Sequence, residues 1–364
     1  MKRFLDSIAF VFLLIVLGIT VSCGGSGSGG GAGGGPGGNT GGGTGGGAAN
    51  LGATAVGVSG DPDTWPLVPV QVLGKPILLQ SWGYLEPSQG TYDWTNSDAW
   101  IAQCQGHNVP CIFTFGGVPK WAAAAGVNCG QYTCAGPPAN MQDLTDFASA
   151  VAARYAGKIA VYEMWNEPEA PDQFNGTEPQ LVAMTKAIYA AVQQQDPSAH
   201  FSTPGWETNN TESAQIASIK NYFDNGGGFE TYLSFHWYPR VLADCTVGTI
   251  LTCANTALPA DIAAIKAVSN GRPLLLTESS WGPDADVPSA DQPTFATAWV
   301  DAVQSAHIVG IWWAWQKAGQ PSDSWGTLWN GEALDAAGQA FAAAVNPQNQ
   351  QDAARQGGET RENR

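Results

Sequence analysis

The sequence has 364 residues, of which 44% are apolar and only 13% are charged, and its formal net charge is −16. This length and composition allow a large buried core, which excludes an intrinsically disordered or fibrous protein. The 15 Lys and Arg residues form no cluster in the central part of the chain, so nucleic acid and anionic lipid surfaces are disfavoured as partners. The 15 Trp residues and many neutral polar residues suit a neutral polar ligand.

Residues 1–22 have the pattern of an export signal. Lys2 and Arg3 precede an apolar segment from Ile8 to Val21. At about 14 residues this segment is shorter than the roughly 20 that a membrane-spanning helix needs. The small residue before Cys23 resembles the lipobox of bacterial lipoproteins, in which the cysteine becomes the lipidated N-terminus. We expect a lipoprotein anchored through Cys23 at the bacterial cell surface or in the periplasm; an ordinary signal peptide with secretion is the alternative.

Two further segments lack the apolar residues that a core requires. Residues 24–47 are almost entirely Gly, Ser and Thr, which predicts that residues 23–50 form a flexible tether. Its mean span would be roughly 25–30 Å, enough to hold a domain away from a membrane. The polar residues 347–364 are predicted to form a disordered tail. The folded domain is therefore expected at residues 51–346.

Short apolar runs alternate with Ala-rich helical patterns through this domain, which indicates repeated βα units and a parallel sheet. Strands are predicted at Ala55–Ser59, Pro76–Gln80, Val109–Phe115, Ile159–Trp165, His200–Thr203, Tyr232–His236, Pro273–Thr277 and Val309–Trp313. Helices are predicted at Asn140–Tyr155, Glu178–Gln195, Ser213–Phe223, Ala260–Val268, Pro293–Ala306 and Ala333–Val345. Eight strands in roughly 295 residues fit a single α/β domain, a (β/α)8 TIM barrel. An open doubly wound sheet is the alternative, and it would need a Gly-rich phosphate-binding turn after the first strand. The turn at residues 57–60 does not begin a GxGxxG pattern and has no P-loop Lys.

Six cysteines follow Cys23, and with export they imply an oxidising compartment and disulfides. Proximity in the sequence favours three local pairs, which are Cys104 with Cys111, Cys129 with Cys134, and Cys245 with Cys253. No CxxC pair occurs and the four histidines are scattered, so we expect neither a metal site nor a cofactor.

Two glutamates, Glu167 and Glu278, lie at corresponding positions, each at the C-terminal end of a predicted strand. Glu167 ends an apolar run and precedes Pro168, which cannot donate to a strand ladder, so the strand should end there. Glu278 follows residues 274–277 in the same way. Because parallel strands bring their C-terminal ends to one face of a barrel, we expect Glu167 and Glu278 to face each other across one pocket, where two carboxyl groups are suited to acid/base chemistry. Glu163, earlier on the same strand, is predicted to be a buried structural acid, and Glu169 beyond Pro168 to be exposed.

Nearly every predicted strand end is followed by a Trp. A flat apolar ring matches the CH-lined face of a pyranose, while amide, imidazole and phenol groups can bind its hydroxyls. Trp121, Trp281 and Trp315 are the predicted sugar platforms, with Trp313 as an alternative to Trp315. Trp165, Trp299 and Trp312 are predicted to pack in the core. The predicted polar contacts are Asn166, His236 and Tyr238.

Four motifs make this pattern specific: WNEP at 165–168, HWYP at 236–239, TESSWG at 277–282 and WWAW at 312–315. They resemble retaining glycoside hydrolases of clan A, and most of all enzymes similar to family 39, over about residues 74–316. The resemblance implies that Glu167 is the acid/base, Glu278 the nucleophile and Asn166 the donor to the sugar 2-hydroxyl. His236 and Tyr238 would line the site.

The expected function is a monomeric retaining glycosidase that acts on cell-wall or storage polysaccharide or on oligosaccharide. Such an enzyme needs two carboxyl groups about 5–5.5 Å apart, one protonated and one ionised. The alternative is a non-catalytic carbohydrate-binding barrel on the cell surface. Its support is a departure from the resemblance: many clan members carry an Arg on the second strand that supports the nucleophile, and no Arg occurs between residues 60 and 106.

Overall fold

The computed structural model describes residues 51–61, 64–74, 81–207, 211–239, 245, 249–314 and 324–346. The expected export signal, tether and tail lie outside these residues, and so do Cys23, Trp315 and the predicted second strand at residues 76–80. Among the helices in the described ranges, none has the length and apolar character to cross a bilayer.

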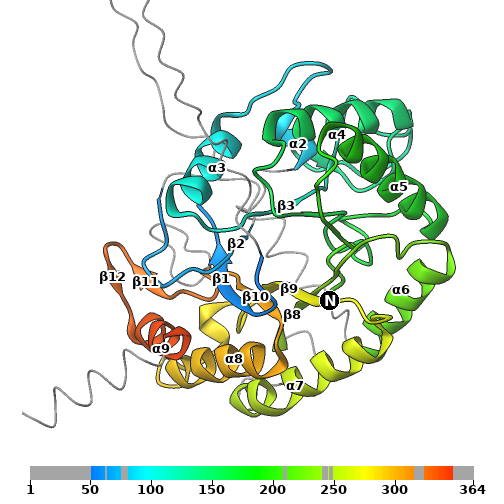
Figure 1. Cartoon of the computed structure of the whole chain (residues 1–364). Coiled ribbons are helices and arrows are strands. Elements are labelled where there is room, and N and C mark those ends of the chain that lie inside the picture. Colours follow the sequence, from blue (N-terminus) through cyan, green and yellow to red (C-terminus); the bar gives the residue numbers. More distant parts are fainter. Residues whose placement is uncertain are drawn as a thin grey trace, which may run out of the picture. The chain divides into compact units, whose positions relative to one another are not determined.

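Eight parallel strands form a closed ring at the centre of the domain (Figure 1). One sheet has the order β2 (Leu73–Gly74), β1 (Ala55–Ser59), β10 (Val309–Trp312), β9 (Leu274–Ser279) and β8 (Leu233–Trp237). The other has the order β3 (Ile112–Thr114), β6 (Val161–Glu163) and β7 (Phe201–Ser202). Parallel bridges from Leu73 to Cys111 and from Ser202 to Tyr232 join the two sheets on both sides. The predicted (β/α)8 barrel is therefore confirmed.

Helices surround this ring (Figure 1). They are α2 (Trp82–Leu85), α3 (Thr95–His107), α4 (Met141–Tyr155), α5 (Glu178–Gln195), α6 (Glu212–Asp224), α7 (Ile250–Val268), α8 (Gln292–Ala306) and α9 (Ala336–Val345). Short antiparallel pairs lie between them, β4 (Val118–Pro119) with β5 (Thr133–Cys134) and β11 (Trp329–Asn330) with β12 (Ala333–Leu334). α7 begins ten residues before the predicted helix because it continues through Pro259, a residue that normally marks a boundary.

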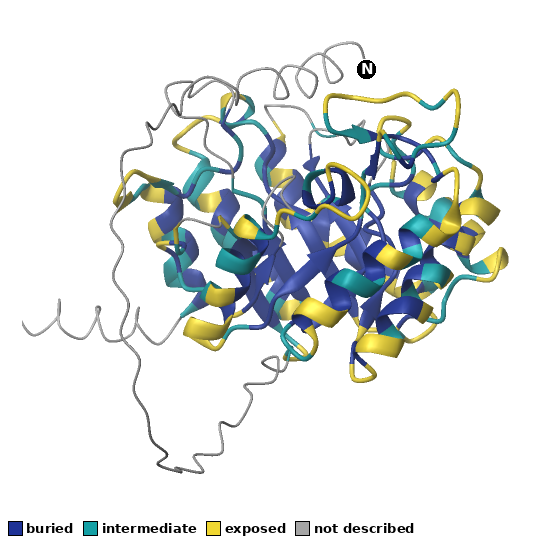
Figure 2. Ribbon diagram, turned by 90° about the horizontal axis from the view of Figure 1, so that it is seen from above, coloured by how far each residue is buried: buried dark blue, intermediate teal, exposed yellow. Residues whose placement is uncertain are grey.

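The core fills the barrel and the layer between strands and helices. Every residue of the eight barrel strands is buried. Figure 2 shows these strands in dark blue inside helices whose outer faces are exposed. Trp165, Trp299 and Trp312 are fully buried, as predicted, and Trp299 packs edge-on against Trp312 and stacks on Phe341 of α9.

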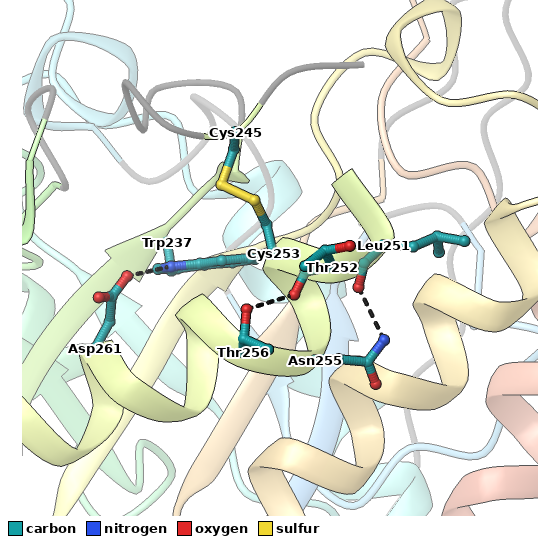
Figure 3. Close-up of a disulfide and its surroundings, with 8 residues drawn as sticks. All are labelled: Trp237, Cys245, Leu251, Thr252, Cys253, Asn255, Thr256 and Asp261. Atoms are coloured by element: carbon teal, nitrogen blue, oxygen red, sulfur yellow. Dashed lines mark hydrogen bonds between the residues drawn. A yellow bond between two sulfur atoms is a disulfide. The ribbon is translucent and has the colours of Figure 1, made fainter. Parts of the chain in front are cut away.

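Three disulfides close short loops, and they join the cysteine pairs that proximity in the sequence favours. Cys104–Cys111 ties α3 to the residue before β3, and Cys129–Cys134 closes the loop that leads into β5. Cys245–Cys253 ties the segment after β8 to the first turn of α7 (Figure 3). Because each bridge spans few residues, each restrains a local segment of the chain.

Candidate active site

Glu167 and Glu278 meet at the C-terminal face of the barrel. β6 ends at Glu163, earlier than predicted, but the chain continues beside Gly205: the Gly205 amide donates to the Trp165 carbonyl and the Glu167 amide to the Gly205 carbonyl, both at 2.9 Å. Glu278 lies within β9. A carboxylate oxygen of Glu167 lies within 4.8 Å of a carboxylate oxygen of Glu278. The side chains are 15% and 12% exposed, so the pair is enclosed but accessible.

His236, at the end of β8, lies between the two glutamates. Its Nδ1 is 2.7 Å from Glu167 Oε1 and 3.9 Å from Glu278 Oε2, and the ring is fully buried. A register shift between Phe235 and His236 places His236 opposite Glu278 in the ladder with β9. The expected contact of His236 with the site is therefore present in the structure.

Tyr238 holds the second glutamate. Its hydroxyl donates to Glu278 Oε1 at 2.8 Å, and the residue is only 4% exposed. Burial raises the pKa of Tyr238 well above its usual value, and the neighbouring Glu278 and Glu167 charges raise it further. Tyr238 therefore remains a hydrogen-bond donor at neutral pH, and a donor of this kind favours the ionised form of Glu278. In this protein Tyr238 gives Glu278 support of the kind that an Arg on the second strand would supply.

The backbone of Glu167 is left-handed, with φ of 43°. This conformation is uncommon for a residue with a Cβ and costs roughly 1–3 kcal/mol, and such strain collects at functional sites. Asn166, the predicted donor to the sugar 2-hydroxyl, is partly exposed on the same turn and bridges to Gly205. The turn thus presents both residues at the rim of the barrel.

Glu163 lies below the site as a structural acid. It is fully buried, accepts a hydrogen bond from Thr114 of β3 at 2.7 Å, and accepts another from Thr277 of β9 at 2.5 Å. A Cβ on Gly205 would lie 3.0 Å from Glu163 Oε1 and 2.4 Å from His236 Nε2. Only glycine therefore allows this strand end to pack against both side chains.

The exposure predicted for Glu169 is wrong. Both of its carboxyl oxygens are buried, because the chain after Pro168 turns back so that the Ala170 amide donates to the Glu167 carbonyl at 3.0 Å. Burial raises the pKa of Glu169 well above its usual value, and the charges of Glu167 and Glu207 raise it further. Glu169 therefore favours its neutral form beside the proposed acid/base.

Glu207 is a site residue to which the sequence analysis assigned no role. It is 7% exposed and follows the extension of β7, in which Trp206 bridges to Phe235 of β8. Burial raises the pKa of Glu207 to about 8; the charge of Glu167 also raises it and that of His236 lowers it. The sequence signal was its place two residues after Gly205 at a strand end, which is the same kind of position that Glu167 occupies.

The predicted sugar platforms divide into three cases. Trp281 is fully buried, donates to Asp284 Oδ1 at 2.9 Å and packs edge-on against Trp312, so it faces the helices and its prediction as a sugar platform is wrong. Trp121 is partly exposed, and its Nε1 donates to the Glu86 carbonyl at 2.9 Å, so it stays a candidate. Trp315 lies outside the described residues.

Trp325 is a further aromatic residue at the site that the sequence analysis missed. It is partly exposed and packs edge-on against Tyr238, with ring centroids 5.6 Å apart. It also bridges to Pro283, a few residues after Glu278. No strand pattern precedes Trp325 closely in the sequence, so only the folded chain reveals its position.

Glu167, His236 and Glu278 are also the group that could offer ligands to a metal ion. Tetrahedral ligands that lie about 2.0–2.2 Å from an ion are roughly 3.3 Å apart. The 2.7 Å contact between His236 Nδ1 and Glu167 Oε1 is shorter and has the length of a hydrogen bond. The arrangement fits proton transfer better than metal coordination.

Comparison with known proteins identifies a family of glycoside hydrolases. Residues 75–319 match the family model described as Cellulase (glycosyl hydrolase family 5), which belongs to the clan expected from the motifs, although the family is 5 and not 39. No curated protein matches the chain.

Several solved structures share the fold. A glucosidase from Croceicoccus marinus has a TM-score of 0.59 and 16% identity over 82% of this chain and 68% of its own. Xylanase 10B from Thermotoga petrophila RKU-1, solved with xylobiose, has a TM-score of 0.56 and 12% identity over 81% and 95%. A GH10 endoxylanase from a sugarcane soil metagenome has a TM-score of 0.55 and 14% identity over 80% and 96%. At these identities the likeness shows the barrel fold alone.

Proposed function

We propose that this chain, which belongs to the cellulase family (glycosyl hydrolase family 5, clan A) and is an O-glycosyl hydrolase, cleaves β-linked polysaccharide by a retaining double displacement. The observation that carries the retaining mechanism is the approach of Glu167 and Glu278 oxygens to within 4.8 Å. Retaining enzymes place their carboxyl groups about 5–5.5 Å apart, whereas inverting enzymes need roughly 6.5–9.5 Å to admit a water.

In the first step, Glu167 gives its proton to the glycosidic oxygen while a Glu278 oxygen attacks the anomeric carbon. The carbon–oxygen bond to the leaving sugar breaks, the leaving group departs as an alcohol, and a glycosyl ester forms on Glu278. In the second step, Glu167 takes a proton from water, the water oxygen attacks the same carbon, and the Glu278 carboxylate leaves. Two inversions give net retention.

Each neighbour supports one of these roles. The Tyr238 hydroxyl donates to Glu278 and stabilises it as a carboxylate before attack and as a leaving group afterwards. The His236 contact at 2.7 Å orients the Glu167 carboxyl. Asn166, on the turn that carries Glu167, would bind the sugar 2-hydroxyl.

The proposed substrates are β-linked glucan or xylan of cell walls and their oligosaccharides. The family description and the names of the similar glucosidase and xylanases support this class, as do the partly exposed Trp121 and Trp325 at the rim. A family 39-like specificity, suggested by the rim motifs, is the finer form of this proposal. We also propose that the enzyme acts as a monomer outside the cytoplasm, tethered through a lipid at Cys23.

The test is hydrolysis of a panel of β-glucans, xylans and their oligosaccharides, with the first-formed anomer followed by NMR. We expect release of reducing ends and initial appearance of the β-anomer from a β-linked substrate. Initial release of the α-anomer would contradict double displacement. Binding to a polysaccharide without any bond cleavage would favour the second candidate, a non-catalytic carbohydrate-binding barrel.

A further inference from the structure

The segment His236-Trp237-Tyr238 contacts both proposed catalytic carboxyl groups through its first and last residues. His236 Nδ1 lies 2.7 Å from Glu167 Oε1, and the Tyr238 hydroxyl donates to Glu278 Oε1 at 2.8 Å. Because side chains alternate along a strand, Trp237 points the other way, toward the surrounding helices. A displacement of this segment would therefore change both contacts at once.

Trp237 fastens the segment to the helical layer. The residue is fully buried, and its indole N–H donates to Asp261 Oδ2 of α7 at 2.7 Å, as Figure 3 shows. Its ring stacks on Phe295 of α8 with centroids 6.5 Å apart. An indole has a single N–H, so Asp261 accepts the one hydrogen bond that this side chain can donate.

Asp261 occupies the buried face of α7. It is 5% exposed and shares that face with the apolar residues Leu258, Ile262 and Ile265. A carboxyl group in such a setting loses hydration and needs partners. The contact with Trp237 supplies one partner, and the carboxyl group of Glu212, at the start of α6, is near enough to raise the pKa of Asp261.

We propose that Asp261 is a positioning residue for glycoside hydrolysis, which acts through Trp237 to hold His236 and Tyr238 against Glu167 and Glu278. The inference rests on the proposed function of these two glutamates. The Cys245–Cys253 disulfide gives the same stretch of chain a second tie to α7 (Figure 3). Cys253 lies roughly two helical turns before Asp261, so α7 contacts β8 at Trp237 and is joined to the later chain at Cys245.

The Trp237 contact should strengthen when Asp261 is ionised, because a charged acceptor makes a stronger hydrogen bond than a neutral one. Burial raises the pKa of Asp261 to about 6; the Trp237 hydrogen bond lowers it and Glu212 raises it. Among the described residues, the neighbouring elements contribute little else that titrates: Asp301 of α8 is exposed, and His236 of β8 points into the barrel. The tie is therefore tight above about pH 6 and weakens below it.

The test compares Asp261→Ala, Trp237→Phe and the double variant with Asp261→Asn, all in the full chain. Asp261→Ala and Trp237→Phe should each lower kcat about tenfold on an aryl β-glycoside, with KM changed less than about twofold, since one hydrogen bond is lost in each. The double variant should fall no further, because both changes break the same contact. Asp261→Asn should restore most of kcat at pH 7, because the amide oxygen can accept the hydrogen bond from Trp237.

Asp261→Asn should also remove the part of the kcat profile that titrates near pH 6. The matched control is Asn255→Ala on the same helix, whose side chain donates only to Leu251 of α7 and is exposed (Figure 3). Its kcat should equal that of the unmodified protein. Losses that add in the double variant, or an unchanged kcat in both single variants, would overturn the proposal.

A second readout does not depend on activity. The chain has four histidines, so 15N-histidine labelling gives four pairs of ring nitrogen signals that are simple to assign by substitution. Trp237→Phe should shift the His236 signals and leave those of His107 unchanged, and this variant carries the test if Asp261→Ala fails to fold. Unchanged His236 signals would overturn the positioning role. Absence of hydrolysis by the unmodified protein, with these shifts present, would instead defeat the proposed function.

Discussion

The two glutamates of the site are held in opposite ways. Glu278 lies inside β9, in register with His236 of β8, and receives a hydrogen bond from Tyr238. Glu167 lies beyond the end of β6 and has a left-handed backbone conformation. Two further carboxyl groups that are largely buried, those of Glu169 and Glu207, lie next to it.

This difference separates the two chemical roles. A hydrogen-bond donor stabilises a carboxylate, which suits the proposed nucleophile Glu278. Around Glu167, burial and repulsion between carboxyl groups raise the pKa values of Glu169 and Glu207, so this side of the site retains protons, which suits an acid/base. The barrel brings oxygens of the two glutamates within 4.8 Å of each other, so these two environments are adjacent.

The largest effect should come from Glu278→Ala. Turnover of every substrate should fall by roughly four orders of magnitude or more, because no covalent intermediate can form. Added azide should restore activity by attack from the opposite face and give the inverted glycosyl azide, which NMR identifies. Glu332→Ala, a change at an exposed glutamate, is the control and should keep full activity. A retained azide product from Glu278→Ala would reverse the two assignments.

Glu167→Ala should have a smaller effect that depends on the leaving group. Natural glycosides should lose roughly 10²–10⁴-fold in kcat/KM, whereas an activated aryl glycoside should lose far less, since its leaving group needs little protonation. The glycosyl ester on Glu278 should then accumulate, and azide should release it with retained configuration. Mass spectrometry of the trapped protein and NMR of the product check both points. An equal loss for both substrate types would count against Glu167 as the acid.

Tyr238→Phe tests the support of the nucleophile. Loss of a hydrogen bond to a charged group should lower kcat about 10- to 100-fold. The acid side of the activity profile should move to higher pH, because the Glu278 carboxylate has lost a donor. Tyr189→Phe, on α5 outside the barrel, is the control for removal of a hydroxyl. A profile that keeps its acid side would show that Tyr238 does not govern the ionisation of Glu278.

Glu207→Gln gives the smallest effect, on stability. The pKa of Glu207 is about 8 in the folded protein and roughly 4.5 when unfolded, so the folded state holds this proton more tightly. Its favourable contribution is present below about pH 4.5 and is lost as pH rises toward 8. Glu207→Gln should therefore flatten the fall in melting temperature between pH 5 and 8, a fall that corresponds to a few kcal/mol of unfolding free energy at most. Equal melting curves for both proteins across this range would rule out a neutral Glu207.

The sequence predicts the barrel and the central pair for a shared reason. Buried parallel strands leave continuous apolar runs, and their carboxyl ends must meet at one face, so the strand pattern alone is enough to bring Glu167 and Glu278 together. α3 was not predicted because only Ser97, Trp100, Ile101 and Cys104 of its 13 residues are buried, too few for a clear helical stripe.

Residues beyond the strand ends were harder to place. Glu169 and Trp281 both closely follow one of the two proposed catalytic glutamates, yet the carboxyl group is buried within a turn and the indole faces the helices. Trp325 reaches Tyr238 from a distant part of the chain. Side-chain direction in these segments depends on the path of each loop, which leaves no periodic signal in the sequence.

The hydrogen bond from Thr277 to Glu163 has a consequence for how the chain folds. It joins residues 114 positions apart and links the three-stranded sheet to the five-stranded one. Contacts of such long range form only after intervening segments are ordered, because closing a long loop costs entropy before the contact compensates. Glu278 lies in the five-stranded sheet and Glu167 lies just beyond β6 of the three-stranded sheet. The proposed catalytic pair is therefore assembled only when the two halves of the barrel have joined, and we expect a half-folded chain to be inactive.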